Sequence, residues 1–203
     1  MFRTIKIVFN ATIIVLALIG FNAIGGQRYI EAIRDGIGTF IAQHNSESIK
    51  KIGDFSKINE EFIIDNTMSI AGYKAVLAEH KASGQKMVIL DSGKKTLITK
   101  EDIQGQSIDT KLKDLSEKVN YKGVKVQDLS VVNRGTIELY GQKVPYAKFD
   151  AHVSRLPISD ISGMVASIKT SDGNEKLALS LSEKKKYSQL IANEFFKGIC
   201  ETK

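Results

Sequence analysis

The pattern of hydrophobic and polar positions divides the chain into an apolar segment near its start and a longer part built from short alternating runs. Residues 7–26 carry no charged side chain. A helix of about 20 apolar residues spans the roughly 30 Å hydrocarbon core of a bilayer. Residues 1–26 are therefore predicted to form an N-terminal membrane anchor that contacts membrane lipids through residues 7–26. Arg3 and Lys6 precede the apolar run, which favours a single-pass topology with a cytoplasmic N-terminus and an extracytoplasmic domain.

Two other interpretations of this apolar run stay open. A secretory signal peptide is cleaved after small residues at positions −3 and −1 of the site. Cleavage after Ala23 would place Phe21 at −3, so an uncleaved signal anchor is preferred, and secretion after cleavage is the alternative. In the remaining interpretation the run is a helix buried in the protein core.

Residues 27–53 follow with the spacing of an amphipathic juxtamembrane helix. Charged side chains lie between apolar positions three or four residues apart, a pattern that gives a helix one apolar face. This face could lie on the membrane surface, on a partner protein, or on the folded domain of the same chain, which is the preferred interpretation. The apolar positions are Ile30, Ile33, Ile37, Phe40 and Ile41.

From Asp54 onward the pattern changes to short runs in which apolar and polar residues alternate, as expected of strands that bury one face. Three hairpins are predicted, each closed by residues that favour turns. The paired strands are 73–80 with 85–91, 136–140 with 143–153 around Gly141-Gln142, and 163–170 with 176–183; residues 62–66 are a further strand candidate.

Two stretches in this region have helical spacing instead. The first places Ile108, Leu112, Leu115 and Val119 on one face, with Asp109 as its cap. The second places Tyr187, Leu190, Ile191, Phe195 and Ile199 on one face.

The fold class that follows is α+β: an N-terminal transmembrane helix, then one antiparallel sheet of about six strands covered by two helices. Residues 54–203 are predicted to form this single extracytoplasmic domain. Pro145 has no backbone N–H for a sheet ladder, so its place early in 143–153 predicts an edge strand or a strand start.

The order of elements in the last part of the chain resembles a known fold group. A strand pair closed by a glycine turn, a second hairpin ending in LALSLS, and the terminal helix YSQLIANEFF resemble the PsbP-like/Mog1-like group of photosystem extrinsic subunits over about residues 124–199. The resemblance implies a non-catalytic domain that binds or helps assemble membrane complexes, and it carries over no functional residue. Cystatin-like and NTF2-like sheets, which also wrap helices with antiparallel strands, are alternative folds.

Composition and charge narrow the classes of function. The single cysteine, Cys200, can form neither an intrachain disulfide nor a zinc cluster. The formal charge of +6 is spread along a chain in which acidic residues lie between the lysines. A nucleic-acid binder concentrates its basic residues in a stripe or a known motif, so no nucleic acid is expected as a partner. Lys184, Lys185 and Lys186 form a run, and they are candidate contacts with lipid headgroups or a partner protein.

The chain carries no motif with catalytic or cofactor-binding spacing. His44, His80 and His152 do not share the spacing of a helical metal site. No phosphate-binding glycine motif and no nucleophile elbow occurs. Accordingly, no catalytic, cofactor-binding or metal-binding residue is assigned, and no cofactor is expected. His80 and His152 each end a predicted strand, where a carboxylate from elsewhere in the chain could meet them.

Three functions are weighed on these observations. The first is a membrane-tethered interaction or assembly domain without catalytic activity, with a protein partner at the membrane. The first alternative is a ligand-binding module, which requires an apolar cavity of roughly 300 Å³ or more between sheet and helix. The second alternative is an enzyme with a dispersed site around His80 or His152, which requires a polar pocket that holds the histidine with a carboxylate.

Overall fold

The computed structural model describes residues 41–43, 46–70, 73–93, 98–117, 126–154 and 160–202. All eight strands in these ranges pair antiparallel in one sheet of order β1-β2-β3-β4-β8-β7-β6-β5. The strands are β1 Ile41–Gln43, β2 Phe62–Ile70, β3 Tyr73–His80, β4 Lys86–Gly93, β5 Val126–Leu139, β6 Gln142–Val153, β7 Asp160–Lys169 and β8 Glu175–Glu183. The helices are α3 Ser46–Ile52, α4 Lys100–Gln104, α5 Ser107–Glu117 and α6 Gln189–Lys197.

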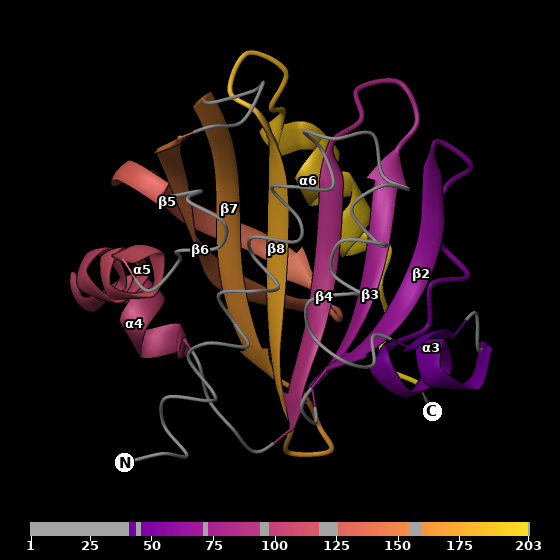
Figure 1. Ribbon diagram of the computed structural model, residues 1–203. Helices are drawn as coiled ribbons and strands as arrows, with labels where there is room; N and C mark the ends of the chain where they lie inside the picture. Colours follow the sequence, from indigo (N-terminus) through magenta and orange to yellow (C-terminus); the bar gives the residue numbers. More distant parts are fainter. Residues whose placement is uncertain are drawn as a thin grey trace.

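The sheet is covered on both faces, which gives three layers (Figure 1). Successive side chains of a strand point to opposite faces, and β8 shows the division clearly. Leu177, Leu179 and Leu181 pack in a core with Ile103 of α4 and Ile108 of α5. The opposite core contains Ala178 together with Ala192, Phe195 and Phe196 of α6. The helices predicted at 108–119 and 187–199 therefore lie on opposite faces of the sheet.

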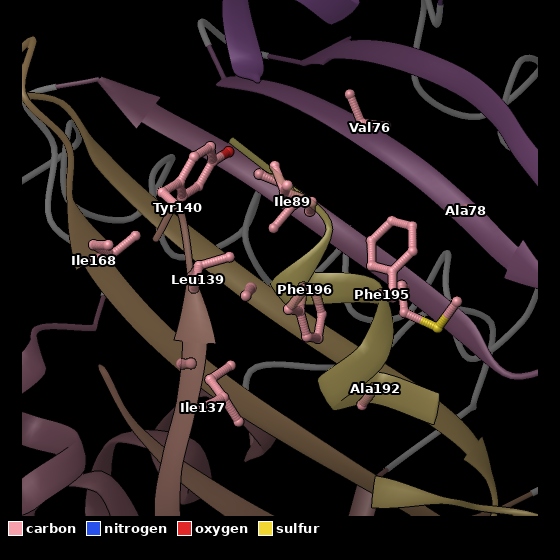
Figure 2. Close-up of a cluster of buried hydrophobic side chains, with 14 of the residues drawn as sticks. Val76, Ala78, Ile89, Ile137, Leu139, Tyr140, Ile168, Ala192, Phe195 and Phe196 are labelled. Carbon is pink, nitrogen blue, oxygen red and sulfur yellow. The ribbon is translucent and has the colours of Figure 1, made fainter. Parts of the chain in front are cut away.

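The second of these cores lies between the sheet and α6, as Figure 2 shows. Phe195 and Phe196 project from α6 and are almost completely buried, at 1% and 0% exposure. Their rings lie 5.4 Å apart at a steep angle, an arrangement that aromatic pairs prefer. Tyr140 lies at one end of the cluster, on the turn that follows β5.

The described residues form eight strands, where about six were predicted. The helices also differ from the prediction, in their limits and in their caps. Thr99 caps α4 through a capping box with Asp102, whose side chain accepts a hydrogen bond from the Thr99 amide. The helix at 108–119 is confirmed over the described range, but it begins at Ser107, so Asp109 lies inside its first turn rather than at its cap. Ile41, predicted to be helical within 27–53, belongs to β1, where it pairs with Ser69 of β2.

The hairpin formed by β5 and β6 differs by one residue from the predicted turn. Leu139 pairs with Gln142, so the turn residues are Tyr140 and Gly141 rather than Gly141 and Gln142. Both have positive φ, 51° and 72°, as a two-residue hairpin turn that follows the twist of the strands requires.

Pro145 does not lie on an edge strand, because β6 is between β5 and β7. It pairs with Thr136 on the β5 side, while pairing with β7 begins only at the next residue, Tyr146. The missing N–H of proline therefore costs β6 no hydrogen bond to β7.

Strand β5 changes the face that it buries along its length. Val126, Leu129 and Val131 pack toward the core on the α5 side, whereas Ile137 and Leu139 belong to the core on the α6 side. Two bulges, between Gln127 and Ser130 and between Val131 and Asn133, insert the extra residues. Because the side-chain period of a strand is two, an extra residue moves the following side chains to the other face.

Among the residues within these ranges, no helix is long and apolar enough to cross a membrane. The predicted anchor, residues 7–26, and most of the predicted helix 27–53 lie outside the described residues. The part of 27–53 that is described as helix, α3, docks on the domain, since Ile52 is completely buried in the core on the α6 side.

Candidate functional site

The two ends of the sheet carry the polar side chains from which a functional site could be built. At one end, which we call the far end, β3 turns into β4 at residues 81–85 and β8 leads into residues 184–188. At the other end, which we call the α3 end, residues 140–141 and 171–174 form turns beside α3. The β7–β8 register, from Ile161 opposite Glu183 to Lys169 opposite Glu175, places the two ends one full strand length apart.

The lysine run predicted as a contact site lies at the far end, and the neighbouring acids engage two of its members. The Lys184 Nζ lies 2.8 Å from the Asp150 Oδ2, and the Lys186 Nζ lies 2.9 Å from the Glu183 Oε2. Lys185 is exposed to solvent. All three lysines are on the surface, and Lys184 and Lys186 are part of the packing at the end of β8.

Asp150 is the acceptor at the centre of this network. Burial raises the pKa of its carboxyl group, but hydrogen bonds from Lys184 and Ser162 outweigh burial and hold the pKa below its usual value. Further along β6, the His152 Nδ1 lies 3.0 Å from the Asp160 Oδ1, and the histidine side chain is partly exposed while the aspartate side chain is largely exposed. This histidine joins two neighbouring strands, β6 and β7.

His80 closes the β3–β4 hairpin. Its Nδ1 accepts a hydrogen bond from the Ser83 backbone N–H at 3.2 Å and lies 2.9 Å from the Ser83 hydroxyl. Its Nε2 lies 3.7 Å from a Glu61 carboxylate oxygen. The three side chains resemble a nucleophile–base–acid set, but the Ser83 Oγ also accepts the Gln85 N–H, so its bonds hold the turn together. The histidine is buried and its ring packs on Phe62, which is a structural role.

Gln85 is a buried polar residue that the sequence analysis did not single out. Its Nε2 donates to the Ser180 hydroxyl at 2.8 Å and to the Ser188 carbonyl at 2.9 Å, while its Oε1 accepts the Ser188 N–H at 2.8 Å. Ser188 is the N-cap of α6. Gln85 therefore fixes the start of α6 to β8 and to the β3–β4 hairpin.

Leu190 lies in the first turn of the helix that Gln85 fixes, and it is 77% exposed. The prediction that it shares the buried face with Phe195 is wrong. A helix turns by about 100° per residue, so Leu190 lies nearly opposite the buried face formed by Ala192, Phe195 and Phe196. The far end thus presents an apolar side chain five residues after Lys185.

At the α3 end, two side chains hold the last carbonyl of α3. The Tyr140 hydroxyl donates to the Ile52 carbonyl at 2.8 Å, and the Lys176 ammonium donates to the same oxygen at 2.7 Å. Burial, and secondly the charges of Asp91, Glu201 and Asp172, raise the pKa of Tyr140, so its hydroxyl stays protonated as a donor. Lys176 is only 4% exposed, and a cation at a helix C-terminus is favoured by the helix dipole.

Further bonds tie α3 to the end of the chain. The Thr202 hydroxyl donates to the Lys50 carbonyl at 2.6 Å. Asp54 and Cys200 exchange two backbone hydrogen bonds, at 2.8 and 3.0 Å. Figure 1 shows α3 and the C-terminus close together at the lower right. The α3 end is therefore rigidly joined to the core.

A surface groove of about 430 Å³ lies beside α3. It is lined by Ile49, Lys50, Gly53, Asp54, Phe55 and Thr202. The ligand-binding alternative requires a cavity between sheet and helix, and none of the residues that line this groove belongs to a strand. In the part of the chain that the structure describes, no group of three or more His, Cys, Asp or Glu side chains could hold a metal ion. His44 lies outside that part.

Comparison with known proteins finds likenesses among solved structures. No protein-family model matches the chain, and no curated protein matches it by sequence. The solution structure of cyanobacterial PsbP from a Synechocystis species matches 78% of this chain and 90% of its own, with 10% identity and a TM-score of 0.31. The match agrees with the PsbP-like resemblance seen in the sequence. It concerns the fold alone, and the function proposed below rests on this chain's own residues.

Proposed function

We propose that the protein is a membrane-tethered interaction domain without catalytic activity, which binds a protein partner in the extracytoplasmic space through the far end of its sheet. The observation that carries the proposal is Leu190, a large apolar side chain 77% exposed on a helix whose opposite face is core. A partner that covers this side chain removes apolar surface from water, which is favourable at roughly 25 cal/mol per Å².

The charges around Leu190 indicate the kind of partner. Lys185 is exposed four residues before Gln189, the first residue of α6, and Lys184 and Lys186 flank it. An acidic surface with an apolar centre complements this arrangement, and charge complementarity of this kind raises the association rate and sets the register. His80 closes a hairpin, and His152 pairs with a carboxylate on the neighbouring strand. These structural roles support a function without catalysis.

The membrane tether is the part of the proposal that rests on residues 7–26. They are long and apolar enough to span a bilayer, and the basic residues before them favour an extracytoplasmic domain. In this arrangement the far end meets partners that are themselves confined to the membrane or to the space beside it.

Site-specific photo-crosslinking in native membranes tests the interaction. A photoreactive amino acid at Leu190 of the full-length chain should give one defined adduct. The matched control is Val132, which is also apolar and 49% exposed but lies on the β5 bulge; it should give none. Lys185→Glu should reduce the Leu190 adduct several-fold, and added salt should do the same.

Two results would contradict this function. Equal adducts at Leu190 and Val132 would mean that the contact is non-specific. No adduct at Leu190 in membranes where the chain is present and folded would mean that α6 carries no partner.

A further inference from the structure

The register of β1 shows at which end of the sheet Ile41, the first residue of this strand, lies. Ile41 lies opposite Ser69 and Gln43 opposite Thr67. Because the pairing is antiparallel, Ile41 is the β1 residue nearest to Ile70, at the end of β2 that leads to β3. That end of β2 lies at the α3 end, since Lys74 of β3 pairs with Asp91 of β4, which pairs with Lys176 below α3.

The length of chain before Ile41 limits how far this end can lie from a membrane. The predicted anchor ends at residue 26, so residues 27–40 form the connection. Even fully extended, such a segment spans at most about 50 Å, and any helix or fold in it shortens that reach. The connection joins the domain at Ile41, at the α3 end, so this end lies on average nearer the bilayer than the far end.

The exposed charges at this end are mainly lysines. Lys50 and Lys51 lie in the last turn of α3. Among the acids nearby, Asp172 accepts hydrogen bonds from Thr170 and Asn174 of its own turn, and Glu201 accepts one from Ser171. Glu138 is exposed and lies opposite Lys143 in the β5–β6 register. The exposed lysines at this end are Lys50, Lys51, Lys57, Lys74, Lys143, Lys169 and Lys197.

We propose that the α3 end is a docking surface for the anionic headgroups of the bilayer in which the chain is anchored, which turns the far end away from the membrane. The inference rests on the proposed function, because it needs the tether. Lysines within a Debye length of about 8 Å of an anionic surface are attracted to it, and more distant ones are screened. The bonds that lock α3 to Tyr140, Lys176 and Thr202 make this contact orient the whole domain.

The experiment compares how far two exposed positions, one at each end of the sheet, lie from the bilayer in the full-length chain. Cys200→Ser removes the native thiol, and a single cysteine is then placed at Gln142 at the α3 end or at Ala82 at the far end. Both positions are exposed, and neither replaces a lysine. A fluorophore on each cysteine is read in nanodiscs of zwitterionic lipid, or of zwitterionic lipid mixed with phosphatidylglycerol, with a quencher on the headgroups.

In anionic discs we expect the probe at Gln142 to be quenched at least three-fold more than the probe at Ala82. High salt or zwitterionic lipid should remove most of the difference. Lys50→Glu combined with Lys51→Glu should also lower quenching at Gln142, whereas Lys185→Glu, at the far end, should leave it unchanged. Circular dichroism of each variant confirms that the fold is retained.

Three outcomes would overturn the inference. The first two leave the proposed function standing, and the third contradicts its membrane tether as well. Equal quenching of the two probes, or stronger quenching at Ala82, contradicts the orientation. Equal quenching at Gln142 in neutral and anionic discs contradicts the role of the lysines. Loss of the chain from the discs contradicts the tether itself, and the inference falls with it.

Discussion

Phe195 joins the aromatic residues that close the core between α6 and the sheet. Its ring lies 6.4 Å from that of Phe55 and 5.2 Å from that of Phe62, and it is 1% exposed. Phe62 also contacts the ring of His80, 5.2 Å away. The aromatic contacts therefore run from the segment after α3, through α6, to the far end of the sheet.

Truncating Phe195 tests how much this cluster stabilises the domain. Phe195→Ala should lower the free energy of unfolding by about 3–5 kcal/mol, because it removes a buried ring and leaves a cavity. Leu190→Ala, on the exposed face of the same helix, should change it by less than about 0.5 kcal/mol. Chemical denaturation followed by circular dichroism measures both, and similar midpoints for the two variants would contradict the burial described for α6.

A second prediction concerns Asp102 and the stability of the fold in acid. Burial raises the pKa of Asp102, but hydrogen bonds from Lys111 and Thr99 outweigh burial, so the net pKa is below its usual value. The ionised carboxylate therefore stabilises the fold above about pH 4, and this contribution is lost as the pH falls through the lowered pKa. Asp102→Asn should weaken the fold at neutral pH and flatten the loss of stability below about pH 4.

The control for this prediction is Asp114→Asn, on the exposed side of α5. It should leave the acid limb of the stability curve as in the parent chain. Identical acid limbs for the parent chain and for Asp102→Asn, measured by thermal unfolding across the pH range, would contradict the role given to the capping box.

At the scale of single residues, the sequence identified buried apolar positions better than polar ones. The helical spacing found Phe195 and Ile199, both of which are buried. It misplaced Leu190 because the helix begins only at Gln189, so apolar spacing that includes Tyr187 does not describe one face. Gln85 carried no signal, since its partners Ser180 and Ser188 are about a hundred residues away in the chain.

Among the elements, α3 is short, and contacts with the rest of the domain hold it in place. A helix of seven residues is too short to be stable alone in water. Its stability comes from tertiary contacts: buried Ile52, the two donors on its last carbonyl, and the backbone bonds between Asp54 and Cys200. The boundary predicted at Asp54 would separate Ile52 and its carbonyl group from the domain.

Removing α3 is the test at this scale. A chain that starts at Asp54 should be less stable than one that starts at Ser46 by at least about 3 kcal/mol. It loses a buried isoleucine side chain, at about 2–5 kcal/mol, and leaves the Lys176 ammonium without its carbonyl partner. Denaturant titration of the two chains measures the difference. Equal midpoints would show that the core needs nothing before Asp54.

The elements that the sequence missed are those with little hydrophobic periodicity. The α4 helix has five residues, of which only Ile103 is buried. β1 has three residues and no alternation long enough to recognise. The predicted hairpins were found because their strands are largely apolar runs of eight or more residues that end in turn-forming residues.

For the whole molecule, the sequence correctly predicted one antiparallel sheet with helices, and it did not predict that the helices lie on both faces. Strand β7 explains why, because eight of its ten residues are buried without alternation. A strand buried on both sides reads as a continuous apolar run. In hindsight, MVASI and LALSL carried the signal for two covered faces.

The membrane tether is tested in the full-length chain. Leu16→Arg places a charge in the middle of residues 7–26, at a cost of roughly 2.5–3.5 kcal/mol for insertion. We expect the parent chain to stay with membranes after a carbonate wash and much of the variant to be released. Lys6→Arg, which keeps the charge before the run, is the matched control. N-terminal sequencing of the membrane-bound protein that begins near Ile24 would instead indicate a cleaved signal peptide.

Because β5 contains two bulges, the face of the sheet that each of its side chains occupies depends on the number of residues in the strand as well as on their chemistry. Val132 lies at the bulge between Val131 and Asn133, and it is half exposed. Most substitutions there should be tolerated, since the side chain packs on little. Deleting Val132 should be tolerated better than deleting a paired residue of β5. Val131 and Asn133 would keep Phe149 and Lys148, which are consecutive in β6, as their partners, so Ile137 and Leu139 would stay in the core on the α6 side. The bulge at Val132 should therefore tolerate both substitution and the loss of one residue, and length variation within β5 among related chains is expected there rather than at its paired positions.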